Sequence, residues 1–148
     1  MSSLIDPPVD DTYRSLGYAL KRAQQALRGH LDAALRQIGL TTPQYSVLAG
    51  LEARGGLSNA ELARRAFVTA QTMQAIIVTL ERDGLIERRD HPVNGRILTT
   101  ELTPAGRAAL GQAHAIVAGA ETRARDAVAP ADAEILYAAL LRIADALR

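Results

Sequence analysis

The sequence contains no cysteine and no tryptophan, a single phenylalanine and a single lysine. The absence of cysteine excludes disulfides, thiolate zinc sites and cysteine-based redox sensing within this chain. No apolar run approaches the roughly 18 residues that a membrane-spanning helix needs. The N-terminal stretch MSSLIDPPVDD also lacks the pattern of a secretory signal. We therefore expect a cytoplasmic protein that does not contact a membrane.

An excess of charge of one sign is also missing. The 148 residues carry 17 basic and 16 acidic side chains, a formal net charge of +1, which by itself does not indicate a nucleic-acid partner. Hydrophobic residues make up 48% of the chain and are spread along it, as in ordinary globular proteins. This length suits one domain with a core, so residues 1–148 are expected to form a single domain.

Apolar residues recur at three- and four-residue steps, which predicts a mainly helical fold. Asp10 or Asp11 is expected to cap a long first helix. Ser58 and Glu61 have the spacing of a capping box, and Thr69 is a further candidate cap. The expected helices cover residues 12–37, 43–54, 58–66 and 69–83, a long segment from 104, and a last segment after the break APAD.

Two strand-like runs, LIERR at 85–89 and RILTTEL at 96–102, are joined by the segment DHPVNG. Asn94 and Gly95 tolerate positive φ angles, so the pattern predicts a small β wing, a hairpin with an extended tip. Two short helices joined by a tight turn and followed by such a wing of two or three strands form a winged helix-turn-helix. We assign this lobe to residues 43–103, flanked by long helical regions at 10–38 and 104–148.

This arrangement predicts binding to double-stranded DNA. The helix over 69–83 is expected to enter the major groove, and the wing to reach the adjacent backbone or minor groove. Glutamine can pair with adenine, threonine and alanine methyls can meet the thymine methyl, and arginine suits phosphates. A solvated charge is the plain alternative for any one arginine. The predicted DNA-binding residues are Arg64, Arg65, Thr69, Ala70, Gln71, Thr72, Gln74, Asn94, Gly95 and Arg96.

Residues 57–106 resemble the MarR family of dimeric bacterial transcriptional regulators. The matching pieces are ELARRAFVTAQTM, LERDGLIERR and LTPAG, with long helices on both sides. The resemblance implies a homodimer whose terminal helices intertwine, and whose two winged lobes bind a palindromic operator, more often as a repressor. It also implies release by a small aromatic or phenolic effector, bound between the dimerisation helices and the DNA-binding lobe.

The wing departs from the family pattern. Family members usually carry Asp-Arg-Arg before the second strand, whereas this chain has Asn94-Gly95-Arg96. We therefore expect a softer wing with one fewer phosphate contact in each lobe. Arg88 matches the family's arginine on the first wing strand, and Asp90 is its expected partner in supporting the wing.

A second group of residues is a candidate effector pocket. Tyr18 and Tyr45 are expected to line it, Arg14 or Arg22 to pair with an anionic ligand, and His30 to lie nearby on an apolar helix side. Packing alone explains the tyrosines equally well.

No catalytic or metal-binding pattern accompanies these features. The three histidines do not have the spacing of a metal site, and the chain has no P-loop, no GxGxxG and no HExxH motif. We expect no metal, no cofactor and no enzymatic activity. Two alternatives to a DNA-binding regulator stay open: a winged-helix protein-interaction module with weak or no DNA binding, and a ligand-binding or enzymatic protein with a vestigial lobe.

Overall fold

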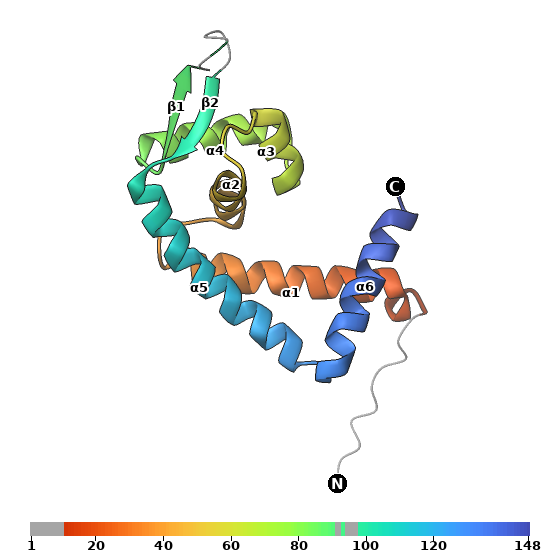
Figure 1. Ribbon diagram of the computed structural model, residues 1–148. Coiled ribbons are helices and arrows are strands. Elements are labelled where there is room, and N and C mark those ends of the chain that lie inside the picture. Colours follow the sequence, from red (N-terminus) through yellow and green to blue (C-terminus); the bar gives the residue numbers. More distant parts are fainter. Residues whose placement is uncertain (1–10, 91–92, 94–97) are drawn as a thin grey trace.

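The computed structural model describes residues 11–90, residue 93 and residues 98–148. This part of the chain is mainly helical and carries one two-stranded antiparallel hairpin, which confirms the expected fold class (Figure 1). The elements are a short 3-10 turn η1 (Asp11–Arg14), then α1 (Leu16–Arg36), α2 (Thr42–Ala53), α3 (Asn59–Ala66), α4 (Ala70–Arg82), β1 (Ile86–Asp90), β2 (Leu98–Leu102), α5 (Pro104–Asp126) and α6 (Pro130–Ala146).

The first long helix starts later than expected. Asp11 lies in η1, Asp10 lies outside the described residues, and the cap of α1 is Ser15. The hydroxyl oxygen of Ser15 accepts a hydrogen bond from the backbone N–H of Tyr18 at 3.1 Å. The expectation of a cap at Asp10 or Asp11 was therefore wrong, because a hydroxyl nearer the apolar stripe satisfies the free N–H groups.

The predicted caps Ser58 and Thr69 are present, and Thr41 and Thr103 act in the same way. Thr41, Ser58, Thr69 and Thr103 each accept a hydrogen bond from the backbone N–H three residues later, at the starts of α2, α3, α4 and α5. Glu61 completes the capping box of α3 by accepting from the backbone N–H of Ser58 at 2.8 Å. These local bonds fix where the short helices of the lobe begin.

The core lies inside the lobe, where α2 packs against α3, α4, α5 and the hairpin (Figure 1). β1 and β2 pair in a register that places Ile86 opposite Leu102, and both side chains are buried. One stripe of α4 faces this core: Met73, Ile77 and Leu80 are buried and Ile76 is half-buried. Other fully enclosed core side chains are Leu35, Val47, Leu48, Leu57, Leu62 and Leu110.

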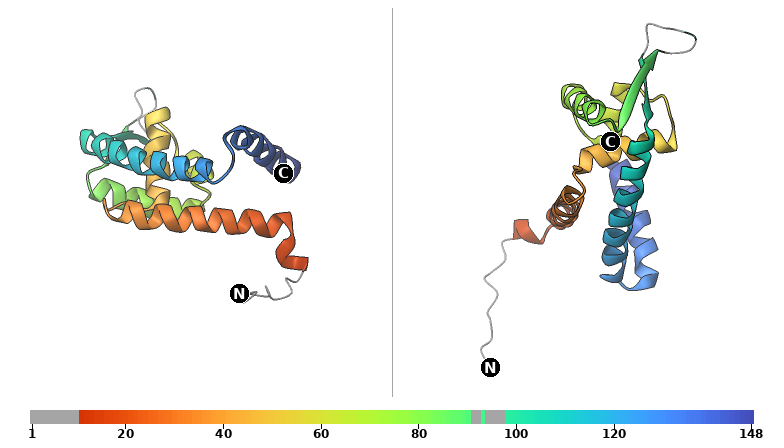
Figure 2. Two further views of the ribbon diagram at one scale, coloured as in Figure 1. Left: turned by 90° about the horizontal axis from the view of Figure 1, so that it is seen from below. Right: turned by 90° about the vertical axis from the view of Figure 1, so that its left-hand side faces the viewer.

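The two ends of the chain extend away from the lobe. α1 and α5 pack against each other beneath it, and α6 turns away at the far end of α5 (Figures 1 and 2). No residue of α6 is buried, and several of its large apolar side chains face solvent, including Leu136, Tyr137 and Leu140. A single chain thus leaves an apolar surface uncovered. None of the helices described is both long and apolar enough to cross a lipid bilayer.

Candidate nucleic-acid interface

Helix α4 has one buried and one exposed side. Its exposed side carries Ala70, Gln71, Thr72 and Gln74, all in the first two turns, and none of these residues is acidic. The N-cap Thr69 is exposed as well, and its hydroxyl donates to the hydroxyl of Thr72 at 3.0 Å. The start of α4 therefore presents neutral hydrogen-bonding groups and methyls, which are the groups that read base edges.

The exposed side of α4 continues further than the sequence analysis proposed. Val78 is 54% exposed, and it lies two helical turns after Gln71 on the same side of the helix. Ala75 is also exposed, between them. An apolar residue left uncovered on this face suits contact with thymine methyls. The seven-residue step from Gln71 was the sequence signal that could have identified Val78.

Arg64 and Arg65 leave the last turn of α3 in different directions. Both are exposed, and the ion pairs recorded between described residues include neither of them. The stem of Arg65 lies against α2, where its Cδ is 3.7 Å from the position that a Cβ of Gly50 would occupy. Both guanidinium groups are thus free to meet phosphates, from different sides of α3.

The turn between α3 and α4 contains an unusual residue. Phe67 adopts the left-handed conformation, with φ of 55°, and its side chain is 96% exposed. The backbone N–H of Val68 donates to the carbonyl of Ala63 at 3.1 Å and closes the turn. A phenylalanine in the left-handed conformation has a strained backbone, and an exposed ring gains no packing energy from the core.

The predicted tip residues of the wing, Asn94, Gly95 and Arg96, lie outside the described residues. Arg88 is half-buried, and it pairs across the hairpin with the buried Thr100. Its Nε is enclosed and has no hydrogen-bond partner. No ion pair joins Arg88 to Asp90, although both are described. The expected ion pair is not present: the Nε of Arg88 is enclosed, and Asp90 is exposed at the end of the strand.

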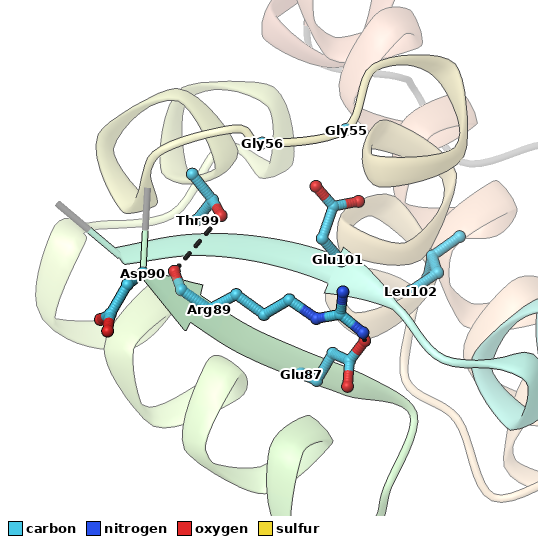
Figure 3. Close-up of a pocket in the computed structure, with 8 residues that line it drawn as sticks. All are labelled: Gly55, Gly56, Glu87, Arg89, Asp90, Thr99, Glu101 and Leu102. Atoms are coloured by element: carbon cyan, nitrogen blue, oxygen red, sulfur yellow. Dashed lines mark hydrogen bonds and ion pairs between the residues drawn. The ribbon is translucent and has the colours of Figure 1, made fainter. Parts of the chain in front are cut away.

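The outer face of the hairpin borders an open hollow of about 560 Å³, next to Gly55 and Gly56 (Figure 3). Figure 3 shows Arg89 lying beside Glu87, with which it forms an ion pair. Glu101 also lines this hollow. Carboxylates outnumber the one arginine, and that arginine is already paired, so this face of the wing repels phosphate.

The five candidate effector residues do not line one common hollow among the described residues. Tyr18 packs edge-on against Tyr13 near the start of α1, with ring centres 5.0 Å apart. Tyr45 instead lies on α2, where its hydroxyl meets Nδ1 of His114 at 3.1 Å. Burial raises the pKa of the Tyr45 hydroxyl, and the charge of Glu52 acts in the same direction.

The remaining three candidates are exposed. Arg14 and Arg22 form no recorded ion pair with another described residue, and His30 borders a hollow between α1, α5 and α6. No group of three or more histidine and carboxylate residues in the described part of the chain is placed to hold a metal ion.

A different hollow, of about 410 Å³, lies between α1, the start of α2 and the α3–α4 turn. Its walls are mainly apolar and include Leu27, Leu31 and Phe67. Arg28 is the charged residue at its edge, and it is held loosely, with its Nε 3.6 Å from Asp32. Asp32 itself accepts a short hydrogen bond from the hydroxyl of Thr42. An apolar hollow lined by one arginine suits an aromatic anion, which would compete with Asp32 for Arg28.

Comparison with known proteins decides the family. The MarR family model matches residues 38–97. The HTH-type transcriptional repressor Rv2887 of Mycobacterium tuberculosis is 43% identical over 108 residues, which are 73% of this chain and 78% of that protein. The chain belongs to the MarR family. MarR members are transcriptional regulators and not enzymes, in agreement with the sequence analysis.

Solved structures extend the likeness to the whole fold. The transcriptional repressor CouR bound to a 23-mer DNA duplex has a TM-score of 0.85 and 31% identity, and the match covers 94% of this chain and 99% of that one. CouR bound to p-coumaroyl-CoA has a TM-score of 0.82 and 30% identity, covering 94% and 98%. Rv2887 of Mycobacterium tuberculosis with salicylic acid has a TM-score of 0.73 and 36% identity, covering 87% and 96%.

Proposed function

We propose that this chain is a DNA-binding transcriptional repressor of the MarR family that acts as a homodimer on a palindromic operator. The observation that carries the proposal is the exposed start of α4, which presents Gln71 and neutral neighbours beside the hairpin. The likeness to CouR on its DNA duplex supports it over nearly the whole chain. Half-sites about one helical turn apart, roughly 10 bp centre to centre, fit two such lobes.

In this proposal the residues divide into two roles. Thr69, Ala70, Gln71, Thr72 and Gln74 contact base edges from α4, and Gln71 is the central one because it points directly away from the core stripe. Phosphate contacts come from Arg64 and Arg65 on α3 and from the wing tip at Asn94, Gly95 and Arg96.

The homodimer is supported by the apolar surface that one chain leaves open. Side chains of α6 and of α1, among them Leu136, Leu140 and Leu27, are exposed although they are large and apolar. Surfaces of this kind mark protein interfaces. We assign residues 10–38 and 104–148 to dimerisation and residues 43–103 to DNA binding, within a cytoplasmic protein.

A small aromatic acid is the proposed effector. Relatives of this chain are known in complex with salicylic acid and with p-coumaroyl-CoA. The hollow between α1, α2 and the α3–α4 turn offers apolar walls and the loosely held Arg28, so it is the preferred location. It adjoins both the dimerisation helices and the lobe, and an occupant there can change the spacing of the two α4 helices.

The test is selection from a random duplex pool with the purified full chain at two salt concentrations. We expect a palindrome and an affinity that falls with salt.

Arg64→Ala and Arg96→Ala should weaken binding similarly on all sequences and reduce the salt slope by roughly 0.9 per lost phosphate contact. Gln71→Ala should relax the preference at one base pair per half-site by about 1–3 kcal/mol. Recovery of no motif, with no binding even at low salt, would contradict the proposal and favour a protein-interaction module.

A further inference from the structure

Gln74 is not a free side chain on α4. The amide nitrogen Nδ2 of Asn59 donates a hydrogen bond to Oε1 of Gln74 at 2.7 Å. Asn59 is the first residue of α3, and Gln74 lies in the second turn of α4, so the bond joins the two helices of the helix-turn-helix. One of the predicted base-reading residues is therefore held by a neighbouring helix before it meets any partner.

The orientation of the Asn59 amide has a physical reason. Its Oδ1 is buried and accepts no hydrogen bond, while its Nδ2 makes the contact with Gln74. Asn59 is at the N-terminal end of α3, where unpaired backbone N–H groups give a partial positive charge. That charge favours the oxygen of the Asn59 amide on the inner side and the nitrogen on the outer side.

The fixed Asn59 amide in turn fixes Gln74. Its Oε1 is held on the side of α3, and the Nε2 of the same planar amide then lies on the other side, with its hydrogens offered outward. Bidentate pairing with adenine needs Oε1 and Nε2 together against one base edge. With Oε1 held toward α3, Gln74 presents the groove with a donor.

We propose that Asn59 is a positioning residue for base recognition, which orients Gln74 to donate from Nε2 to an acceptor on a base. This rests on the proposed DNA-binding function and deepens it. In the major groove guanine shows two acceptors, N7 and O6, whereas the only hydrogen-bonding group of cytosine is the N4 donor. The base that Gln74 contacts should accordingly be read as guanine over cytosine.

The experiment measures base preference in full-length protein, on the operator recovered by duplex selection. Gln74→Ala first identifies the base pair concerned, as the pair at which preference is lost. Asn59→Ala should then lower the guanine-over-cytosine preference at that same pair by roughly 2- to 13-fold, the value of one hydrogen bond from a single donor. The preference at the pair read by Gln71 should not change, which makes it the internal control.

A second substitution tests the orientation itself. Asn59→Asp replaces the donor by a carboxylate, which can only accept, so Gln74 should rotate its amide to donate Nε2–H toward α3 and turn Oε1 to the groove. The order of guanine and cytosine at that pair should reverse. The added negative charge weakens binding to every duplex alike, so ratios between duplexes are compared at one salt concentration.

The outcomes separate the two levels of inference. Relaxation in Asn59→Ala at the Gln74 pair alone, with thermal unfolding like the parent's, supports the positioning role. A parent that recovers a palindrome while Asn59→Ala leaves every preference unchanged, or a Gln74→Ala variant that relaxes no pair, overturns it and leaves the DNA-binding function intact. If the parent protein selects no motif, both the DNA-binding function and the positioning role of Asn59 are contradicted.

Discussion

At the scale of single residues, the junction between the hairpin and α5 shows how tightly one position can be determined. The hydroxyl of Thr103 donates to the carbonyl of Gly84 at 2.6 Å and accepts from the N–H of Gly106 at 3.0 Å. The backbone N–H of Thr103 also donates to the carbonyl of Leu85 at 3.1 Å. A Cβ on Gly106 would lie 1.9 Å from that same carbonyl oxygen, so the close approach requires glycine.

Gly106→Ala should therefore destabilise the fold. The added methyl must displace the backbone at Leu85, which we expect to lower the free energy of unfolding by about 1–3 kcal/mol or more. Gly111→Ala is the matched control on the same helix, because a Cβ there meets nothing within 4 Å. It should stabilise by roughly 0.5–1 kcal/mol through helix propensity. Urea unfolding at equal protein concentration measures both, and equal effects would contradict the close contact.

Phe67 gives a residue-scale prediction of the opposite sign. Its φ of 55° is costly for a side chain with a Cβ, and the exposed ring returns no packing energy. Phe67→Gly should raise the free energy of unfolding by about 1 kcal/mol. Phe67→Ala keeps the Cβ and the strain, so it should not stabilise. Thermal unfolding of the three proteins distinguishes relief of backbone strain from removal of an exposed ring.

At the scale of elements, the sequence predicted what depends on neighbours three or four positions away. The capping box of Ser58 and Glu61 and the cap Thr69 are local patterns, and the structure confirms them. The start of α1 was misplaced because several side chains near it can cap, and the choice of Ser15 depends on where the apolar stripe must meet α5.

Contacts between elements that are far apart in the chain could not be predicted from the sequence. His114 on α5 joins Tyr45 at 3.1 Å and Glu52 at 2.9 Å, both on α2, and thereby ties the lobe to a long helix. Tyr45 and His114 are 69 positions apart, and no spacing rule connects them. The bond from Asn59 to Gln74 was missed for the same reason, since it depends on how α3 crosses α4.

The link between α1 and α2 gives an element-scale prediction about pH. The hydrogen bond from Thr42 is the main cause that lowers the pKa of Asp32 below its ordinary value of 3.8, and the charge of Arg28 adds to it. The contribution of the Asp32 carboxylate to the free energy of unfolding is thus fully present above about pH 4. It is lost as the pH falls through the lowered pKa. The stability difference between the parent and Asp32→Asn should shrink on acidification.

Thr42→Val provides the check on that link. This substitution removes the hydroxyl that donates to Asp32. The effect of Asp32→Asn on the free energy of unfolding should therefore depend less on pH when Thr42→Val is also present. Unfolding of all four proteins at several pH values between about 3 and 6 measures this. An undiminished pH dependence in that background would mean that Arg28, and not the hydroxyl, holds the carboxylate.

At the scale of the whole molecule, the single chain is well packed only in its lobe. The buried apolar residues belong almost entirely to α2–α4, the hairpin and the first half of α5, whereas α6 has none. Along α6 the large apolar residues Leu136 and Leu140 share one side, and Glu134, Arg142 and Asp145 occupy the other. An amphipathic helix without a covered face indicates a partner, and the proposed partner is a second copy of the chain.

Leu140→Glu should then separate the two copies. Leu140 is 39% exposed in one chain and lies at the centre of the apolar side of α6, so a carboxylate there would be buried unpaired in a dimer. Arg142→Glu places an equivalent acid on the opposite, polar side and should leave the association intact. Sedimentation equilibrium should give a monomer for Leu140→Glu and a dimer for the parent and Arg142→Glu.

Because each lobe binds one half-site, the monomer should also lose cooperative binding to the palindrome while keeping weak, salt-sensitive binding. A Leu140→Glu protein that remains dimeric would show that α6 is not at the interface.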